Sequence, residues 1–99
     1  MTVYVDDMYK SPMGQFGRLK MSHMMADTSA ELLEMADRIG VQKKWLQHAG
    51  RPDEHLDIAM SKREAAIAAG AVPITMREMA RMSMNKRREF VATTKEPKL

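Results

Sequence analysis

Short runs of β-branched, aromatic and alternating apolar residues predict several short strands in this chain. Residues 2–5 are β-branched or aromatic and stop at two aspartates, which is typical of a first strand. The Met-rich segment 20–26 predicts a second strand, after a loop at residues 8–19 that contains Pro and Gly. Further strand candidates are 44–47 and 71–74, and residues 55–59 form either a strand or an extended loop. Pro73 places the segment 71–74 at a sheet edge or a strand end, because proline cannot donate a ladder hydrogen bond.

A recurring helix-start motif predicts three helices. Thr28, Ser61 and Thr75 are each followed three residues later by Glu, as in the capping box. In that motif the hydroxyl accepts a hydrogen bond from the N3 amide, and the Glu accepts one from the N-cap amide. The predicted helices cover residues 29–39, 62–69 and 76–90.

The apolar positions within these segments predict which residues are buried. In the first helix they form one face, made of Leu32, Met35, Ala36 and Ile39. Gly40 suits the left-handed position that ends a helix. In the third helix the expected inward positions are Met76, Met79, Ala80 and Phe90. Trp45 is expected in the core as well.

Strands that alternate with helices favour an α/β fold. We predict a small, mostly parallel sheet of about four short strands with three helices packed against it. Ninety-nine residues make one domain, which we place at residues 1–90. The last nine residues, 91–99, have no periodicity and are predicted to be a disordered basic tail.

Charge and composition narrow the possible environments. The net charge is +3, and residues 85–99 account for all of it with five basic and two acidic residues, whereas residues 1–84 balance at 11 of each. Such a tail is a solvated segment or adds loose affinity for nucleic acid. The chain has no cysteine, which excludes disulfides and thiolate zinc sites and favours a reducing, cytoplasmic location. No apolar run approaches the roughly 20 residues that cross a bilayer, so we expect no membrane partner.

Several polar residues are candidate ligand-binding positions. In a parallel sheet, ligands bind beyond the carboxyl ends of the strands, where helix N-termini also point. Asp6 and Asp7 follow the first predicted strand, and Asp27 follows the second. Lys62 and Arg63 lie in the first turn of the second helix, and Arg18 in the loop before the second strand. These cations suit an anionic ligand such as a nucleotide or nucleic acid.

The acids and histidines allow more than one chemistry. Asp6 and Asp7 could bind Mg²⁺ or Mn²⁺, or they could be solvated acids that end a strand. His23 lies among methionines and is either catalytic or a hydrogen-bonded core residue. His55 and Asp57 have same-face spacing on a strand, which allows a catalytic imidazole–carboxylate pair or a plain structural bond. The three histidines lack the i, i+4 spacing of a helical zinc site, which argues against zinc.

The run Gly17-Arg18-Leu19-Lys20-Met21-Ser22-His23-Met24-Met25-Ala26-Asp27-Thr28 resembles the signature of a small phage and bacterial family, catalogued as domain of unknown function 4031. The start Val3-Tyr4-Val5-Asp6-Asp7, the triplet His55-Leu56-Asp57 and the stretch 68–74 are similar to that family as well. The resemblance covers roughly residues 2–80. It implies family polar positions at Asp6, Arg18, His23, Asp27, His55, Asp57 and Arg63. Leu56 stands where family members often have an aromatic. The resemblance implies no activity, but it suggests a phage accessory protein in the cytoplasm of the host cell.

Three functions remain open at this point, and whether the protein is an enzyme is undecided. The first is a binding module for a phosphate-bearing ligand, through Arg18, Lys62 and Arg63. The second is a protein that binds a host protein through the Met-rich third helix and the basic tail. The third is a metal-dependent nuclease or phosphohydrolase. It would use Asp6, Asp7 and Asp27, with Asp57 as a further candidate, and it resembles PIN-like nucleases at the level of fold alone.

Overall fold

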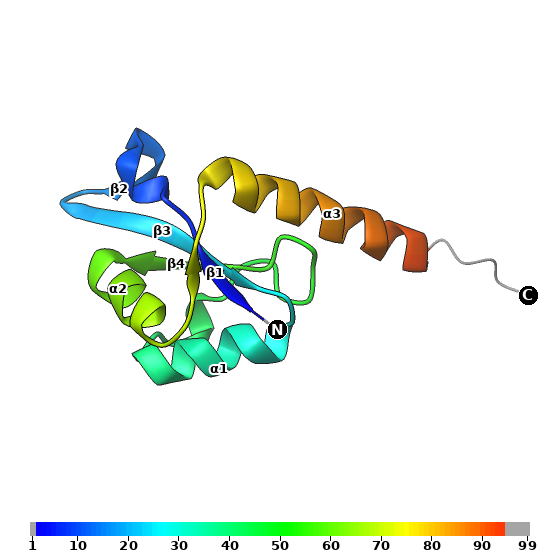
Figure 1. Ribbon diagram of the computed structural model, residues 1–99, viewed down its shortest axis with the longest axis horizontal. Coiled ribbons are helices and arrows are strands. Elements are labelled where there is room, and N and C mark those ends of the chain that lie inside the picture. The colour runs from blue at the N-terminus through cyan, green and yellow to red at the C-terminus, as the bar shows by residue number, and fades with distance from the viewer. Residues whose placement is uncertain (1, 95–99) are drawn as a thin grey trace, which may run out of the picture.

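The computed structural model describes residues 2–94 of the chain, with a mixed sheet between two helices on one face and a third helix on the other (Figure 1). The five strands are β1 (Val3–Val5), β2 (Gln15–Phe16), β3 (Leu19–Ala26), β4 (Leu56–Ala59) and β5 (Val72–Pro73). The helices are α1 (Ser29–Ile39), α2 (Met60–Ala68) and α3 (Met76–Thr94). Three short 3₁₀ helices, η1 (Met8–Lys10), η2 (Pro12–Gly14) and η3 (Lys43–Trp45), occupy the loops. The predicted α/β class with three helices is confirmed.

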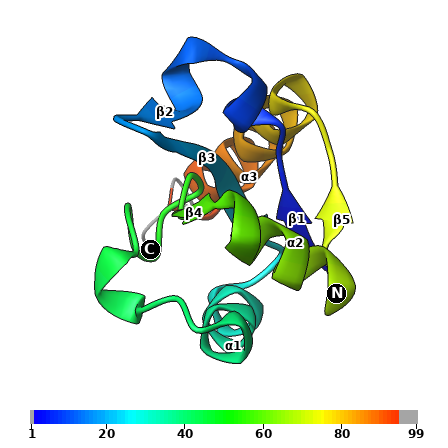
Figure 2. The same ribbon diagram turned by 90° about the vertical axis from the view of Figure 1, so that its left-hand side faces the viewer.

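The sheet is mixed and mainly antiparallel, which corrects the prediction of a mostly parallel one. β3 is the central strand and pairs antiparallel with β1, β2 and β4, whereas the parallel pair is β1 with β5 at one edge (Figure 2). For β4 to run parallel to β3, it would have to begin near the start of β3, where α1 ends. Instead, residues 40–55 carry the chain back to the end of β3, so that Leu56 pairs with Met24 and β4 runs in the opposite direction to β3.

The core lies between the sheet and the α1–α2 layer. The predicted face of α1 is buried there, together with Val5, Met24, Leu56 and Ile58 from the strands. Thr28 caps α1 by accepting from the Glu31 amide at 3.2 Å, and Gly40 ends the helix at φ +81°. Both features are as the sequence predicts, because local signals determine helix ends.

Two predictions for the middle of the chain are wrong. Ser61 does not cap α2, because β4 runs directly into that helix and the extended residue Ala59 occupies the N-cap without a side-chain bond. Residues 44–47 do not form a strand but contain the end of η3, followed by a single bridge from Gln47 to His55. Trp45 is 61% exposed and is not part of the core.

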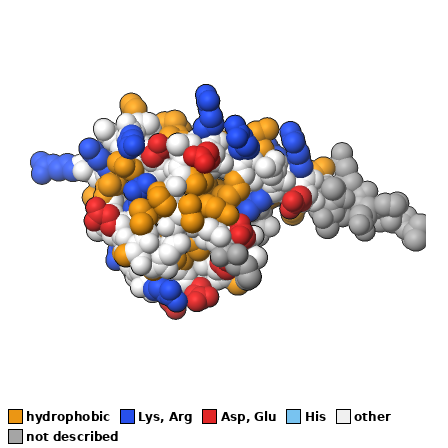
Figure 3. Space-filling model, in the orientation of Figure 1, with side chains coloured by type: hydrophobic (Ala, Val, Ile, Leu, Met, Phe, Trp, Pro, Cys, Tyr) orange, Lys and Arg blue, Asp and Glu red, His pale blue; other side chains and the backbone are white. Residues whose placement is uncertain are grey.

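The third helix extends past the sheet. Thr75 and Glu78 form the predicted capping box at its start, each accepting from the other's amide at 3.1 Å. Of the four expected inward positions, Met79 is buried and Met76 is half-buried, whereas Ala80 and Phe90 are exposed. Phe90 is exposed because the second half of α3 extends beyond the strands (Figure 1). The helix includes residues 91–94 of the predicted tail, and 95–99 lie outside the described residues. Lys and Arg side chains stand along its outer side (Figure 3). No helix within residues 2–94 is long and apolar enough to cross a membrane.

Gly14 is a position where we expect a side chain to destabilise the fold. A Cβ there would lie 2.3 Å from the carbonyl oxygen of Met8 and 2.7 Å from that of Met21. Since both neighbours are backbone, Gly14→Ala should lower the free energy of unfolding by about 2–3 kcal/mol. Gly17→Ala is the control, because it meets nothing within 4 Å and pays only for its φ of +60°, about 1 kcal/mol. Equal losses of the two variants in urea titrations would contradict this expectation.

Candidate functional site

Three neighbouring strands bring polar side chains into one row on the face of the sheet that α3 crosses. Asp6 follows β1 and lies beside His23 of β3, whose backbone oxygen accepts from the Asp6 amide at 3.0 Å. His23 in turn lies directly opposite Asp57 of β4. Directly opposed residues of antiparallel strands point to the same face, so the three side chains converge. The alternating partners Val5, Met24 and Leu56 point into the core on the other face.

Asp6 is a fully buried carboxylate that orients His23. Its Oδ1 accepts hydrogen bonds from the backbone amides of His23 at 2.8 Å and Met8 at 3.1 Å. Its Oδ2 lies 2.6 Å from Nδ1 of His23. An oxygen that already accepts two amide hydrogens favours the ionised carboxylate, which makes Nδ1 of His23 the donor. His23 therefore turns its Nε2 away from Asp6 and toward Asp57.

The second histidine is oriented in the same manner. Nδ1 of His55 lies 2.8 Å from the backbone oxygen of Asp53, which can only accept, so Nδ1 carries the hydrogen. Nε2 of neutral His55 therefore presents a lone pair, and it lies 3.6 Å from Oδ1 of Asp57. The His23 and His55 rings meet edge to face with centroids 5.0 Å apart.

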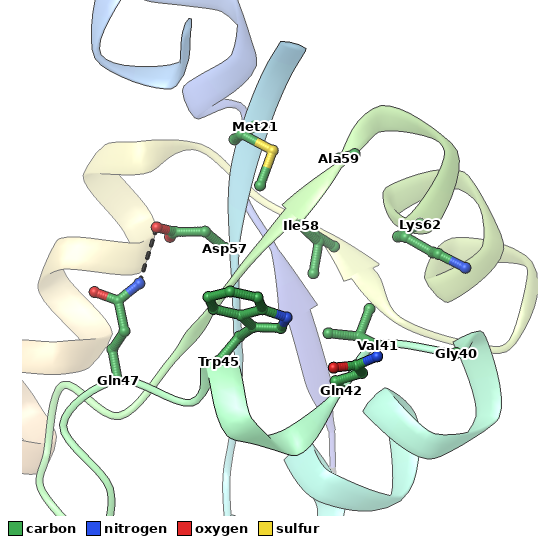
Figure 4. A pocket seen from close by; sticks show the side chains of 10 residues that line it. All are labelled: Met21, Gly40, Val41, Gln42, Trp45, Gln47, Asp57, Ile58, Ala59 and Lys62. Carbon is green, nitrogen blue, oxygen red and sulfur yellow. Dashed lines mark hydrogen bonds between the residues drawn. The ribbon is translucent and has the colours of Figure 1, made fainter. Parts of the chain in front are cut away.

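Asp57 completes the group with an oxygen that has no hydrogen-bond partner. Gln47 donates to its Oδ2 at 3.0 Å, whereas Oδ1 is buried and makes no hydrogen bond with the described residues (Figure 4). Nε2 of His23 lies 3.8 Å from this oxygen, too far for a hydrogen bond. When both rings are neutral, two imidazole lone pairs and a carboxylate oxygen face one another, and either a proton on His23 or a metal ion between the three residues relieves this arrangement. We call His23, His55 and Asp57 the His–His–Asp cluster.

The geometry of the His–His–Asp cluster suits a divalent metal ion. One ligand atom from each residue lies within 4.8 Å of the other two. Ligand atoms bound to one tetrahedral ion at 2.0–2.1 Å are about 3.4 Å apart, close to the 3.6 and 3.8 Å found here. A carboxylate and a backbone carbonyl bonded to the far nitrogens are the usual outer partners of metal-binding histidines. A cavity of about 230 Å³, lined partly by Met25 and Met79, lies beside the two rings.

The other predicted site residues have separate partners. Asp27 accepts from the Thr2 amide and the Tyr4 hydroxyl. Lys62 donates to the carbonyl of Ile39 at the end of α1. Arg63 donates to the backbone oxygen of Asp6 and lies over the Tyr9 ring. Asp7 accepts from the amide of Met76 at the start of α3. Arg18 is exposed in the turn before β3, about 16 Å along the strand from His23.

Sequence reasoning misses parts of this arrangement. It places Gln47 in a strand that does not exist, and the bond from Gln47 to Asp57 depends on the Gln47–His55 bridge. The backbone oxygen of Asp53 has no signal in the sequence. The lack of helical spacing argues against zinc, but cross-strand pairing brings His23 and His55 together without that spacing.

We expect the stability of the metal-free protein to depend on pH through Asp6 and His23. The hydrogen bond to Asp6 raises the pKa of His23 above 6.5, against the effect of burial, and Asp57 adds to the rise. Burial raises the pKa of Asp6, but hydrogen bonds from His23 and Met8 outweigh it, so that the pKa falls below 3.8. The His23 contribution is complete below pH 6.5 and is lost as pH rises through the raised pKa. The Asp6 contribution is present above pH 3.8 and is lost as pH falls through the lowered pKa.

Melting temperatures in EDTA between pH 5 and 9 check this expectation. Wild type should lose stability toward the alkaline end, and His23→Gln should flatten that slope. His48→Asn is the control, because His48 is half exposed and outside the cluster. An equal slope in wild type and His23→Gln would contradict the pairing.

Comparison with known proteins gives one match. The model of a family described as a protein of unknown function (DUF4031) matches residues 3–86. No curated protein and no solved structure matches the chain.

Proposed function

Because the chain belongs to this family, whose description names no activity, we propose its function from the geometry of the site: it binds a divalent transition-metal ion through the His–His–Asp cluster and uses it to activate water. The observation that carries the proposal is the buried Oδ1 of Asp57, which has no hydrogen-bond partner among the described residues and lies 3.8 and 3.6 Å from Nε2 of His23 and His55. A mixed set of two imidazoles and one carboxylate suits Zn²⁺, Mn²⁺ or Fe²⁺ better than Mg²⁺, which prefers oxygen ligands.

The number of protein ligands favours a catalytic metal site over a structural one. Structural zinc sites are closed by four protein ligands, whereas catalytic sites use three and keep a position for water. The cluster supplies three. His23, His55 and Asp57 would hold the ion, and the ion would supply an activated water for hydrolysis near neutral pH.

The third of the three functions is therefore favoured, with a ligand set that keeps Asp57 and replaces the other acids with His23 and His55. Asp6 acts as the outer partner of His23 rather than as a ligand, and Asp7 holds the start of α3. A phosphate-binding module receives less support, because Lys62 and Arg63 each donate to a backbone oxygen and Arg18 is exposed in the turn before β3. A protein-binding function is supported by exposed apolar side chains on α3, but they do not indicate which protein would bind. These residues are Met84, Phe90 and Val91.

The test is a calorimetric titration of EDTA-treated protein with Zn²⁺, Mn²⁺ and Fe²⁺ under anaerobic conditions. We expect one ion per chain and a loss of affinity of about 100-fold or more in His55→Asn, since a direct ligand matters more than an outer partner. His48→Asn is the matched control, because the same replacement removes an exposed imidazole whose ring stacks on His55 at 5.9 Å. Absence of binding, or equal losses in the two variants, would refute the proposal.

A further inference from the structure

A hollow that reaches the His–His–Asp cluster lies on the open edge of β4. Its volume is about 460 Å³, and Asp57 belongs to both the cluster and the wall of the hollow. Figure 4 shows Trp45 in front of β4, with Asp57 and Gln47 on one side and Lys62 on the other. A cavity of this size accommodates a small organic ligand.

Trp45 gives the hollow a flat, accessible aromatic wall. The side chain is 61% exposed although it is the single tryptophan of the chain and a large apolar residue. It projects from η3, and Lys44 lies over its ring at 5.1 Å. An exposed indole face stacks well on planar rings.

The edge of β4 adds a hydrogen-bonding pair to this wall. His55 and Gln47 exchange both of their backbone hydrogen bonds, at 3.0 and 3.2 Å, so the amide and carbonyl of His55 point away from β3. Successive residues of a strand direct their backbone amide and carbonyl groups to opposite edges, so residues two apart share an edge. The amide and carbonyl of Asp57 therefore point to the same outer edge as those of His55, into the hollow. β4 pairs on its other side with β3.

The open edge is too short for an added strand. His55 is already paired with Gln47, and Ala59 is the N-cap of α2, which leaves one residue, Asp57, between them. A peptide that extends a sheet needs several successive pairs. A single donor next to a single acceptor instead matches the edge of a nucleobase, which presents donors and acceptors side by side on a planar ring.

We propose that this hollow binds a nucleobase, stacked on Trp45 and hydrogen-bonded to the backbone of Asp57, so that the attached sugar-phosphate reaches the metal centre. The substrate role of this ligand rests on the proposed metal-dependent function, whereas its binding does not. The base comes from a free nucleotide or from the end of a nucleic-acid strand.

The fluorescence of Trp45 tests the proposal directly, because no other tryptophan contributes. The four nucleoside monophosphates, ribose 5-phosphate and a single-stranded tetranucleotide would each be titrated into EDTA-treated and Zn²⁺-loaded protein. We expect quenching by the base-bearing ligands and none by ribose 5-phosphate. Tighter binding of the tetranucleotide than of every mononucleotide would identify a strand as the source, and the reverse would identify free nucleotides; both support nucleobase recognition.

Calorimetry on two variants adds the matched control. Trp45→Leu should weaken binding of the best ligand about tenfold or more, because a stacking face is lost. Phe90→Leu removes another exposed aromatic side chain, on α3, and should leave the affinity for that ligand unchanged. Absence of binding by every base-bearing ligand, or equal binding of ribose 5-phosphate, would overturn the inference. Metal binding measured on the same preparation separates the two claims: metal without nucleobase refutes the inference alone, and nucleobase without metal refutes the proposed function alone.

Discussion

Asp57→Asn is expected to lower metal affinity about 100-fold or more while leaving the stability of the metal-free protein almost unchanged at alkaline pH, where His23 has lost its extra proton. The affinity falls because a neutral amide replaces the anionic ligand between two imidazoles. Stability is kept because Oδ1 of Asp57 makes no hydrogen bond within the described residues that the fold could lose. If Asp57 had a structural role instead, the substitution would lower stability and leave metal affinity unchanged, since loss of a buried hydrogen-bonding group costs stability.

Asp53→Asn is the matched control for this variant. It makes the same change from carboxylate to amide in a neighbouring loop, and its backbone oxygen still fixes Nδ1 of His55. Calorimetry and urea unfolding would be run on both variants. Equal losses of metal affinity would indicate a general effect of negative charge and would contradict direct ligation by Asp57.

Asp6→Ala is expected to be the most destabilising polar substitution in the chain, with a loss of about 3–5 kcal/mol. It leaves the buried amides of His23 and Met8 and the Nδ1 hydrogen of His23 without an acceptor. Asp6→Asn should be much milder, because its amide oxygen can still accept from the two backbone amides. Urea unfolding of the two variants checks the difference.

Asp6→Asn, the milder of the two variants, also tests whether Asp6 orients His23 for metal binding. In Asp6→Asn the side-chain NH₂ would donate to Nδ1 of His23, which moves the ring hydrogen to Nε2 and points it at Asp57. Metal affinity should then fall about 10–100-fold in a protein that remains folded. If Asp6→Asn bound metal as tightly as wild type, Asp6 would not orient His23 for a ligand role.

The helices and most strands can be predicted because their signals are local. The capping pairs at Thr28 and Thr75, the apolar face of α1 and the edge position of Pro73 each depend on residues a few positions apart. The direction of β4 cannot be predicted in this way, because it depends on the path of residues 40–55, which have no regular pattern. The burial predicted for Trp45 is wrong for a related reason, since its size suggests burial but η3 holds it at the surface.

The sequence predicts the candidate site as a set of residues but not as an arrangement. His23, His55 and Asp57 stand out in the sequence, yet the expected convergence relies on a parallel sheet. The structure brings them together instead through the antiparallel register of His23 with Asp57. Asp27, Lys62 and Arg63 are selected on charge, and charge alone does not distinguish a ligand-binding residue from one that holds a backbone group.

Anomalous diffraction would locate a metal ion between His23, His55 and Asp57. Crystals of EDTA-treated protein would be soaked in Zn²⁺, with data collected above and below the zinc absorption edge. We expect an anomalous peak about 2.0–2.2 Å from Nε2 of both histidines and from an oxygen of Asp57. Strong zinc peaks elsewhere on the protein, with none in this cluster, would contradict the proposed site.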